Sequence, residues 1–282
     1  PVKPADAAPQ ALLSVPDGIF LMVGMVIGVG IFKAPSVVAD NTSGPAMFLG
    51  AWLLGGLVSL CGALVYAELA SRHPETGGEY TFLTRGLHPA VGFVFAWSRM
   101  TVIQTGAIAA VAFVFGEYAN AMLDLGPKGV LVYAALSVVA LTLLNIAGTM
   151  QTKMLQKVME ITLIAGLLAL AAAGMVAGGA PQPAAVNEKR DFLFAMMFVF
   201  FTFGGWNEAA YMAGEVKDPR RNMTTILVWG IVAVTALYLF VNLGYLVALG
   251  QGGVASSKAV GADVMRLVAG DKGAVALSLI VC

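Results

Sequence analysis

The sequence is poor in the residues on which soluble and catalytic proteins depend. Only 11% of its 282 residues are charged, against about 25% in an ordinary soluble domain, whereas 59% are hydrophobic. Cysteine occurs only as Cys61 and Cys282, each inside an apolar run, which argues against a disulfide framework, redox chemistry and a zinc site. Lys+Arg and Asp+Glu both number 16, so neither a nucleic-acid-binding surface nor an acidic tail is indicated. These shortages leave a membrane protein.

Long apolar runs are what the sequence has in abundance. Runs that reach the roughly 20 residues needed to cross a bilayer occur about seven times. They lie at about residues 17–38, 45–70, 89–118, 129–147, 154–177, 191–213 and 223–249. A further apolar pattern runs from Val264 to Cys282, and its uninterrupted part is about half a span long. The predicted fold is all-α and membrane-integral, and the chain is predicted to stop inside an eighth helix.

The loop charges predict the orientation. Residues 1–16 are rich in Pro and Ala and lack the apolar core of a signal peptide, so we interpret them as a cytoplasmic tail. Lys and Arg are more frequent in the short loops on the side of the N-terminus. They are Lys3, Arg72, Arg85, Lys153, Lys157, Lys217, Arg220 and Arg221, against Lys128, Lys189 and Arg190 opposite. This bias predicts a multi-pass protein of the cell membrane with a cytoplasmic N-terminus.

Two spans contain glycines that favour a broken helix. They are Gly24, Gly28 and Gly30 in the first span and Gly204 and Gly205 in the sixth. Each glycine inside a helix costs about 1 kcal/mol relative to alanine, although close helix packing is an alternative explanation. Two broken spans, each opening a set of spans, are typical of inverted-repeat transporters. Amides freed at a break suit a carboxylate and freed carbonyls suit an ammonium, which points to a zwitterionic ligand.

Three ordered motifs carry a family resemblance. GMVIGVGIF in the first span, VYAELASRHPETGGEYTFLTRGLHP after the second, and FTFGGWNEAAYMAGEVKDPRRNM from the sixth onward resemble the amino acid-polyamine-organocation transporters, especially the L-type amino acid transporters. The resemblance implies a five-plus-five inverted-repeat fold of the leucine-transporter type. Its parts would be a tail (1–16), a first repeat (17–177), an extracellular loop (178–190) and a partial second repeat (191–282). Since such a fold needs at least ten spans, we expect an N-terminal fragment that does not transport alone.

The resemblance also implies a substrate site at the two breaks. The amides of Gly28, Val29 and Gly30 would bind the substrate carboxylate. The sixth-span carbonyls of Phe201 and Gly204 would receive the amino group, helped by the first-span carbonyls of Val26 and Ile27. The ring of Phe201 would close over the substrate, and the amide of Asn207 would shape the side-chain pocket. Without the resemblance, Phe201 would be interpreted as a core aromatic.

The sequence says less about which ion gradient or exchanged solute drives transport. Gly166 stands where many L-type relatives have a lysine that takes the place of a coupling sodium ion, so a proton, a cation or exchange all remain open. Arg99 and Glu160 are predicted to lie roughly 15 Å and 10 Å inside their spans. Because charges at that depth are costly, we expect them to approach one another, the alternative being that each reaches polar surroundings separately. Glu208 is a candidate gate contact, proton site or structural acceptor. Phe201, Glu208, Arg99 and Glu160 are therefore the gating or coupling candidates.

The leading prediction is a secondary transporter that moves amino acids by alternating access, with neutral L-amino acids preferred because Glu208 is the only acid beside the breaks. A proton- or cation-coupled transporter of cationic amino acids or polyamines, and a sensor that does not transport, are the alternatives. Catalytic motifs and histidines are missing from the spans, which argues against a membrane enzyme, and neither a cofactor nor a metal is predicted. The loop ANAMLDLGPK has no cysteine, so a disulfide-linked partner subunit is not expected.

Overall fold

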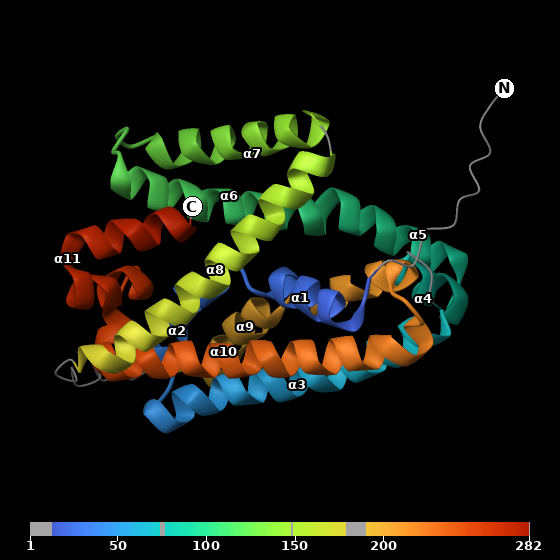
Figure 1. Ribbon diagram of the computed structural model, residues 1–282, viewed down its shortest axis with the longest axis horizontal. Helices are drawn as coiled ribbons and strands as arrows, with labels where there is room; N and C mark the ends of the chain where they lie inside the picture. The colour runs from blue at the N-terminus through green and yellow to red at the C-terminus, as the bar shows by residue number, and fades with distance from the viewer. Residues whose placement is uncertain (1–12, 74–76, 148, 179–189, 282) are drawn as a thin grey trace. The chain divides into compact units, whose positions relative to one another are not determined.

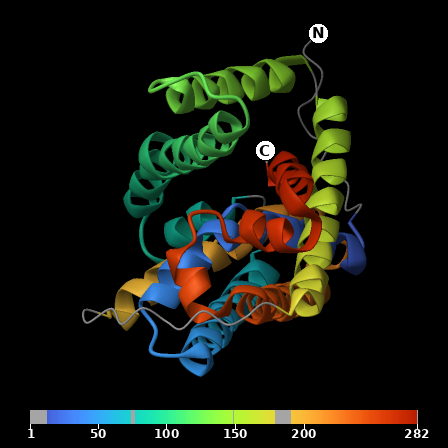
Figure 2. The ribbon, with the colours of Figure 1, turned by 90° about the vertical axis from the view of Figure 1, so that its left-hand side faces the viewer.

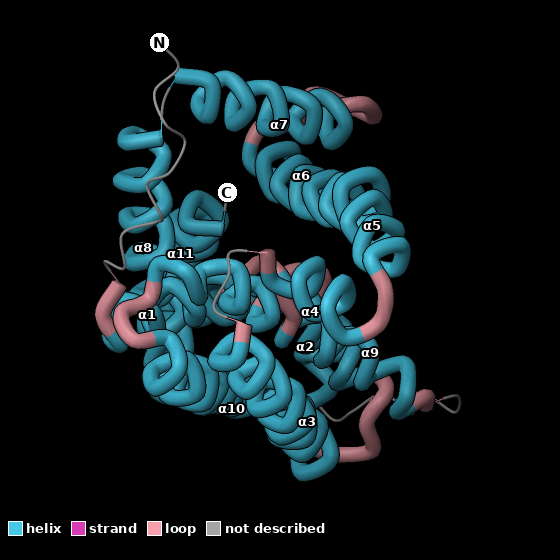
Figure 3. Tube along the Cα trace, turned by 90° about the vertical axis from the view of Figure 1, so that its right-hand side faces the viewer, coloured by secondary structure: helices cyan, strands magenta, loops and turns pink. Residues whose placement is uncertain are grey.

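The computed structural model describes residues 13–73, 77–147, 149–178 and 190–281. Within these ranges the regular elements are all helices, joined by loops (Figure 3). Most of the predicted tail and of the loop 178–190 lies outside the described residues, as does Cys282. The elements are α1 (Val15–Val26), α2 (Gly30–Asp40), α3 (Pro45–Arg72), α4 (Gly78–Gly86), α5 (Pro89–Ser98), η1 (Arg99–Ile103), α6 (Gln104–Met122), α7 (Gly129–Ala147), α8 (Thr149–Ala177), α9 (Phe192–Phe203), η2 (Trp206–Glu215), α10 (Pro219–Ser256) and α11 (Val260–Val281).

The helices are long and apolar enough to confirm the membrane fold. Six described helical segments are long and apolar enough to cross a bilayer, and α1 and α2, bent by 55° at their break, give a seventh when counted as one span. The predicted runs therefore correspond to helices, with α10 starting earlier than expected because Pro219 opens its first turn. The predicted loop after residue 249 is wrong in part. Helix continues to Ser256 beyond a break at Gly250, and α11, which is itself interrupted at Gly270, starts at Val260.

The described chain divides into two compact units, and each is considered by itself. The first comprises Pro1–Gly28, Trp52–Arg99 and Phe200–Ala236, and the second Val29–Ala51, Met100–Val199 and Leu237–Cys282. Helices α3, α9 and α10 contribute to both, as their colours in Figure 1 help to follow. The first unit contains α1, α4, α5 and η2, and the second contains α2, α6, α7, α8 and α11.

In the first unit, α1 is fastened to η2. Ser14 and Asp17 form a capping box that starts α1, with Pro16 in its first turn. Just before it, Leu13 forms a parallel bridge with Val216, in which the Leu13 amide donates to the Glu215 carbonyl at 3.0 Å. The amide of Lys217 donates back to the Leu13 carbonyl, also at 3.0 Å. Helix α1 and η2 also pack against one another. Backbone hydrogen bonds and side-chain packing thus both hold α1 against η2.

The core of each unit is apolar and closely packed. In the first unit Trp52 and Phe203 are both fully buried, with ring centroids 6.4 Å apart. In the second unit α8 and α10 meet backbone to backbone, since a methyl group built on Gly174 would lie 2.6 Å from the Gly244 carbonyl oxygen. Helices α6 and α7 lie side by side in Figures 1 and 2, and most of their apolar side chains are exposed, as suits a lipid-facing surface.

A buried amide ties the end of α2 to α10 in the second unit. Gln251 is 6% exposed, and its Nε2 donates to the carbonyls of Ala39 and Thr42 at 3.1 Å and 2.8 Å. We expect Gln251→Leu to lower the free energy of unfolding by about 1–3 kcal/mol, because it leaves buried carbonyl groups without this donor. Ser256→Ala, whose hydroxyl bonds back to Gly252 and Gly253 of its own helix, is the control and should change stability by less than about 0.5 kcal/mol. Thermal unfolding in detergent would compare them; equal effects would contradict the role given to Gln251.

Candidate functional site

The first predicted break is present between α1 and α2. Helix α1 ends at Val26, and Ile27 has extended backbone angles of φ −73° and ψ 110°. The Ile27 amide donates to the Val23 carbonyl at 2.9 Å, and the regular helix ends there. Val26 and Ile27 are buried, whereas Gly28 is exposed and no described atom lies within 4 Å of a Cβ built on it. The helix is thus interrupted next to open space at Gly28, which a small ligand could occupy.

The second predicted break lies between α9 and η2. Gly205 has φ 107°, a left-handed conformation that favours glycine, and it ends the α-helix. The chain continues as a 3₁₀ helix, whose first bond runs from the Glu208 amide to the Gly205 carbonyl at 3.0 Å. Phe201, in the last turn of α9, has 64% of its surface exposed, and Asn207 is half-buried on η2. An exposed aromatic at a helix break is available to a ligand, since the core does not use it.

Within the first unit the two breaks touch. A Cβ built on Gly205 would lie 2.3 Å from the carbonyl oxygen of Met25 and 3.4 Å from the Cα of Val26. Only a residue without a side chain permits this approach. Of the predicted substrate residues, Val26, Ile27, Gly28, Phe201, Gly204 and Asn207 belong to this unit, whereas Val29 and Gly30 open α2 in the other. The contact brings together backbone that the sequence separates by more than half its length.

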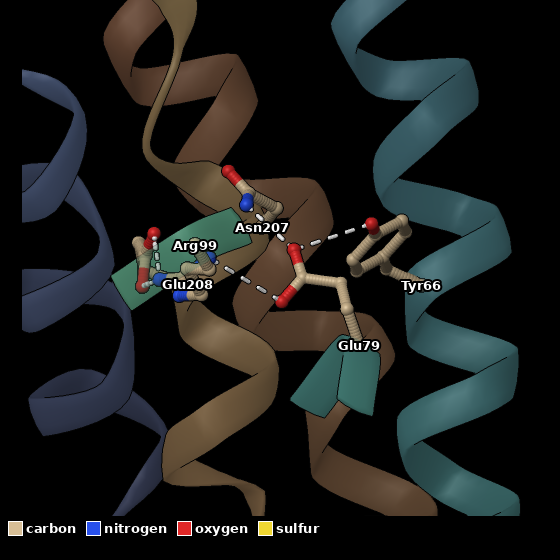
Figure 4. A network of polar contacts seen from close by, with 5 residues as sticks. All are labelled: Tyr66, Glu79, Arg99, Asn207 and Glu208. Atoms are coloured by element: carbon tan, nitrogen blue, oxygen red, sulfur yellow. Dashed lines mark hydrogen bonds and ion pairs between the residues drawn. The ribbon is translucent and has the colours of Figure 1, made fainter. Parts of the chain in front are cut away.

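Next to the breaks lies a network of charged and polar side chains, drawn in Figure 4. Arg99, at the end of α5, directs Nη2 at both carboxylate oxygens of Glu208 on η2. Its Nη1 lies 3.7 Å from Oε2 of Glu79, and its guanidinium lies over the Tyr211 ring at 4.7 Å. One guanidinium thus serves two carboxylates, so the three charged groups sum to one negative charge when all are ionised.

Glu79 is the most buried member of this network. Its side chain, on α4, is 8% exposed, compared with 17% for Arg99 and 34% for Glu208. Oε1 of Glu79 accepts from Asn207 Nδ2 at 2.7 Å and from the Tyr66 hydroxyl at 3.3 Å. Oε2 has no hydrogen-bond donor among the described residues, and Arg99 Nη1, at 3.7 Å, is its ion-pair partner.

The gating candidates are partly brought together. Arg99 and Glu208 pair directly, and Glu79 joins them as a second carboxylate beside Arg99. Glu160 lies on α8 in the second unit, 9% exposed, and its approach to Arg99 stays a prediction. Glu68 and Arg72 pair with one another on the surface, 60% and 71% exposed.

Sequence reasoning missed helix α4, Tyr66 and Tyr211. The segment GEYTFLTRG has low hydrophobicity overall, so it does not stand out beside the spans. A weak signal was available, because Tyr80 and Phe82 follow Glu79 closely and aromatic side chains are often at least partly buried. Among the described residues, no group of His, Cys, Asp and Glu has the arrangement needed to hold a metal ion.

Comparison with known proteins finds relatives among amino acid transporters and exchangers. The chain is 30% identical over 229 residues to the serine/threonine exchanger SteT of Bacillus subtilis (strain 168), covering 80% of this chain and 52% of that protein. It is 28% identical over 272 residues to the human b(0,+)-type amino acid transporter 1, covering 92% of this chain and 55% of that protein. It is 28% identical over 257 residues to the human large neutral amino acids transporter small subunit 2, covering 85% and 48%.

The chain thus spans about half the length of the curated relatives it matches. The sequence profile of one family covers almost all of it, from residue 13 to residue 282. This range includes both helix breaks and every residue of the network in Figure 4. These relatives are transporters and exchangers, not enzymes. The chain is a multi-pass membrane protein of the amino acid permease family.

Proposed function

We propose that the complete gene product is a secondary transporter that moves neutral L-amino acids across the cell membrane by alternating access. The observation that carries this proposal is the contact of the two helix breaks at Gly205 and Met25, next to open space at Gly28. Interrupted helices at such a place suit the two charged ends of an amino acid. Relatives named for serine and threonine or for large neutral amino acids support a neutral substrate.

The substrate residues proposed are those of the two breaks. The amides of Gly28, Val29 and Gly30 would bind the carboxylate, and the carbonyls of Val26, Ile27, Phe201 and Gly204 would receive the amino group. Asn207 would line the side-chain pocket. The N-terminus is proposed to be cytoplasmic, with residues 17–177 and 191–282 as parts of two repeats. A disulfide-linked partner is not proposed, although one relative is named as a small subunit.

One observation favours a second candidate, a transporter of cationic amino acids. The network beside Asn207 contains two carboxylates for one guanidinium, so it would attract a positive side chain. Uptake of a labelled panel of neutral and cationic amino acids into proteoliposomes with the complete gene product separates the two. The same vesicles, empty or preloaded and with sodium or pH gradients, distinguish exchange from coupled uptake. Binding without flux would contradict transport and leave a sensor.

Phe201→Ala should abolish most transport without unfolding the protein. Because the Phe201 side chain is exposed, its loss removes little buried surface, whereas Phe203 is fully buried and Phe203→Ala should destabilise by about 3–5 kcal/mol. The initial rate of uptake and the unfolding temperature in detergent measure the two effects separately. Normal uptake by Phe201→Ala would remove the closing role proposed for this ring.

A further inference from the structure

The amide of Asn207 is held in one orientation by a carboxylate. Asn207 Nδ2 donates to Oε1 of Glu79 at 2.7 Å. An ionised carboxylate can only accept hydrogen bonds, whereas an amide has a donor end and an acceptor end. Turning the Asn207 amide over would place its oxygen against the oxygen of Glu79. The neighbour therefore determines which end of Asn207 points away from it.

Glu79 cannot readily turn aside, because other helices hold it. The hydroxyl of Tyr66 on α3 donates to the same Oε1 at 3.3 Å. The guanidinium of Arg99 lies 3.7 Å from Oε2 and is itself held by Glu208 and by the ring of Tyr211. With 8% of its side chain exposed, Glu79 has little room to find another partner. The acceptor that orients Asn207 is thus fixed by α3, α5 and η2 together.

The consequence is an oriented acceptor beside the helix break. Oδ1 of Asn207 points away from Glu79 in Figure 4, and no hydrogen bond to it is found among the described residues. Asn207 lies two residues after Gly205, where the two breaks touch. We propose that Glu79 is a positioning residue that, through Asn207, presents an acceptor to the substrate side chain and so selects amino acids with a side-chain hydroxyl. This inference rests on the proposed transport of neutral amino acids.

The expected preference for threonine over valine can be derived from the hydrogen bond that valine cannot form. Threonine and valine have nearly the same shape, but only threonine can donate to Asn207 Oδ1. Valine would cover that oxygen without a donor, and an unsatisfied buried acceptor costs about 1–3 kcal/mol. We therefore expect kcat/KM for threonine to exceed that for valine by about tenfold or more.

The test is the threonine-to-valine ratio of kcat/KM in proteoliposomes that contain the complete gene product. In Glu79→Gln the new side chain can donate or accept, so Asn207 is no longer oriented. The ratio should fall about tenfold, through a higher KM for threonine, while valine transport stays nearly unchanged. Glu79→Asp stays an acceptor and should keep a ratio above that of Glu79→Gln. Glu117→Gln, which removes the ion pair with Lys33 in the other unit, should keep the ratio of the unmodified protein.

Several outcomes would overturn the inference. Equal kcat/KM for threonine and valine in the unmodified protein would do so, as would an unchanged ratio in Glu79→Gln. If Glu79→Gln slows both substrates equally, Glu79 has only a structural role. If Glu79→Gln does not fold, the unmodified protein in detergent supplies the comparison. Threonine should raise its unfolding temperature more than valine does, and an equal rise contradicts the proposal. Transport of neutral amino acids without this preference refutes the inference alone, and the absence of any amino acid transport refutes the proposed function.

Discussion

Gly205→Ala is expected to lower the free energy of unfolding by about 3 kcal/mol or more, the sum of two separate costs. Alanine at φ 107° is strained, and its methyl group would lie 2.3 Å from the carbonyl oxygen of Met25. Because the obstacle is backbone, no side-chain rotation relieves it. The unfolding temperature in detergent and the yield of monodisperse protein measure the loss.

Gly50→Ala is the matched control for this prediction. Gly50 lies within α3, and no described atom is found within 4 Å of a Cβ built there. Alanine is the better helix former by about 1 kcal/mol, so this variant should be as stable as the unmodified protein or more so. A Gly205→Ala protein with unchanged stability would show that the two breaks do not touch as described.

Arg99→Met should be the most damaging loss of a charge, at about 3–5 kcal/mol of unfolding free energy. It leaves Glu79 and Glu208 facing one another without their shared cation, and Glu79 is almost completely buried. Adding Glu208→Gln removes one of the two negative charges, so Arg99→Met/Glu208→Gln should recover part of the loss. A double-mutant cycle on unfolding temperature measures this recovery.

Arg72→Met supplies the comparison for Arg99. Arg72 also pairs with a glutamate, Glu68, but both side chains are more than half exposed and lie one turn apart on α3. Such pairs contribute about 0.3–0.5 kcal/mol, so this variant should be nearly as stable as the unmodified protein. If Arg99→Met is no worse than Arg72→Met, the network in Figure 4 does not stabilise the first unit.

The sequence was sufficient for the spans and for both helix breaks. Apolar length identifies a membrane helix because the bilayer has a fixed thickness, and clustered glycine identifies a break because it weakens the helix locally. These signals are local, so Gly28 and Gly205 could be found without knowing their neighbours. The end of α10 was harder to predict, since the small and polar residues after the break at Gly250 resemble a loop but form a further helical stretch to Ser256.

The partners of Arg99 could not be predicted in the same way. Depth in the membrane indicates that a buried charge needs a partner, but it does not say which one. Glu160 was the expected partner because it lies at a similar predicted depth. The contacts with Glu208 and Glu79 depend on how η2 and α4 pack beside α5, and neither the 3₁₀ helix nor α4 has a strong signature in the sequence.

The bridge between Leu13 and Val216 has a mechanical consequence. Helix α1 is joined to the segment that contains η2 at both of its ends, by the backbone bonds at Leu13 and by the Gly205 contact at Met25. A tilt of α1 alone would have to break the first or open the second. We therefore expect α1 and η2 to move together, because they are attached at both ends of α1.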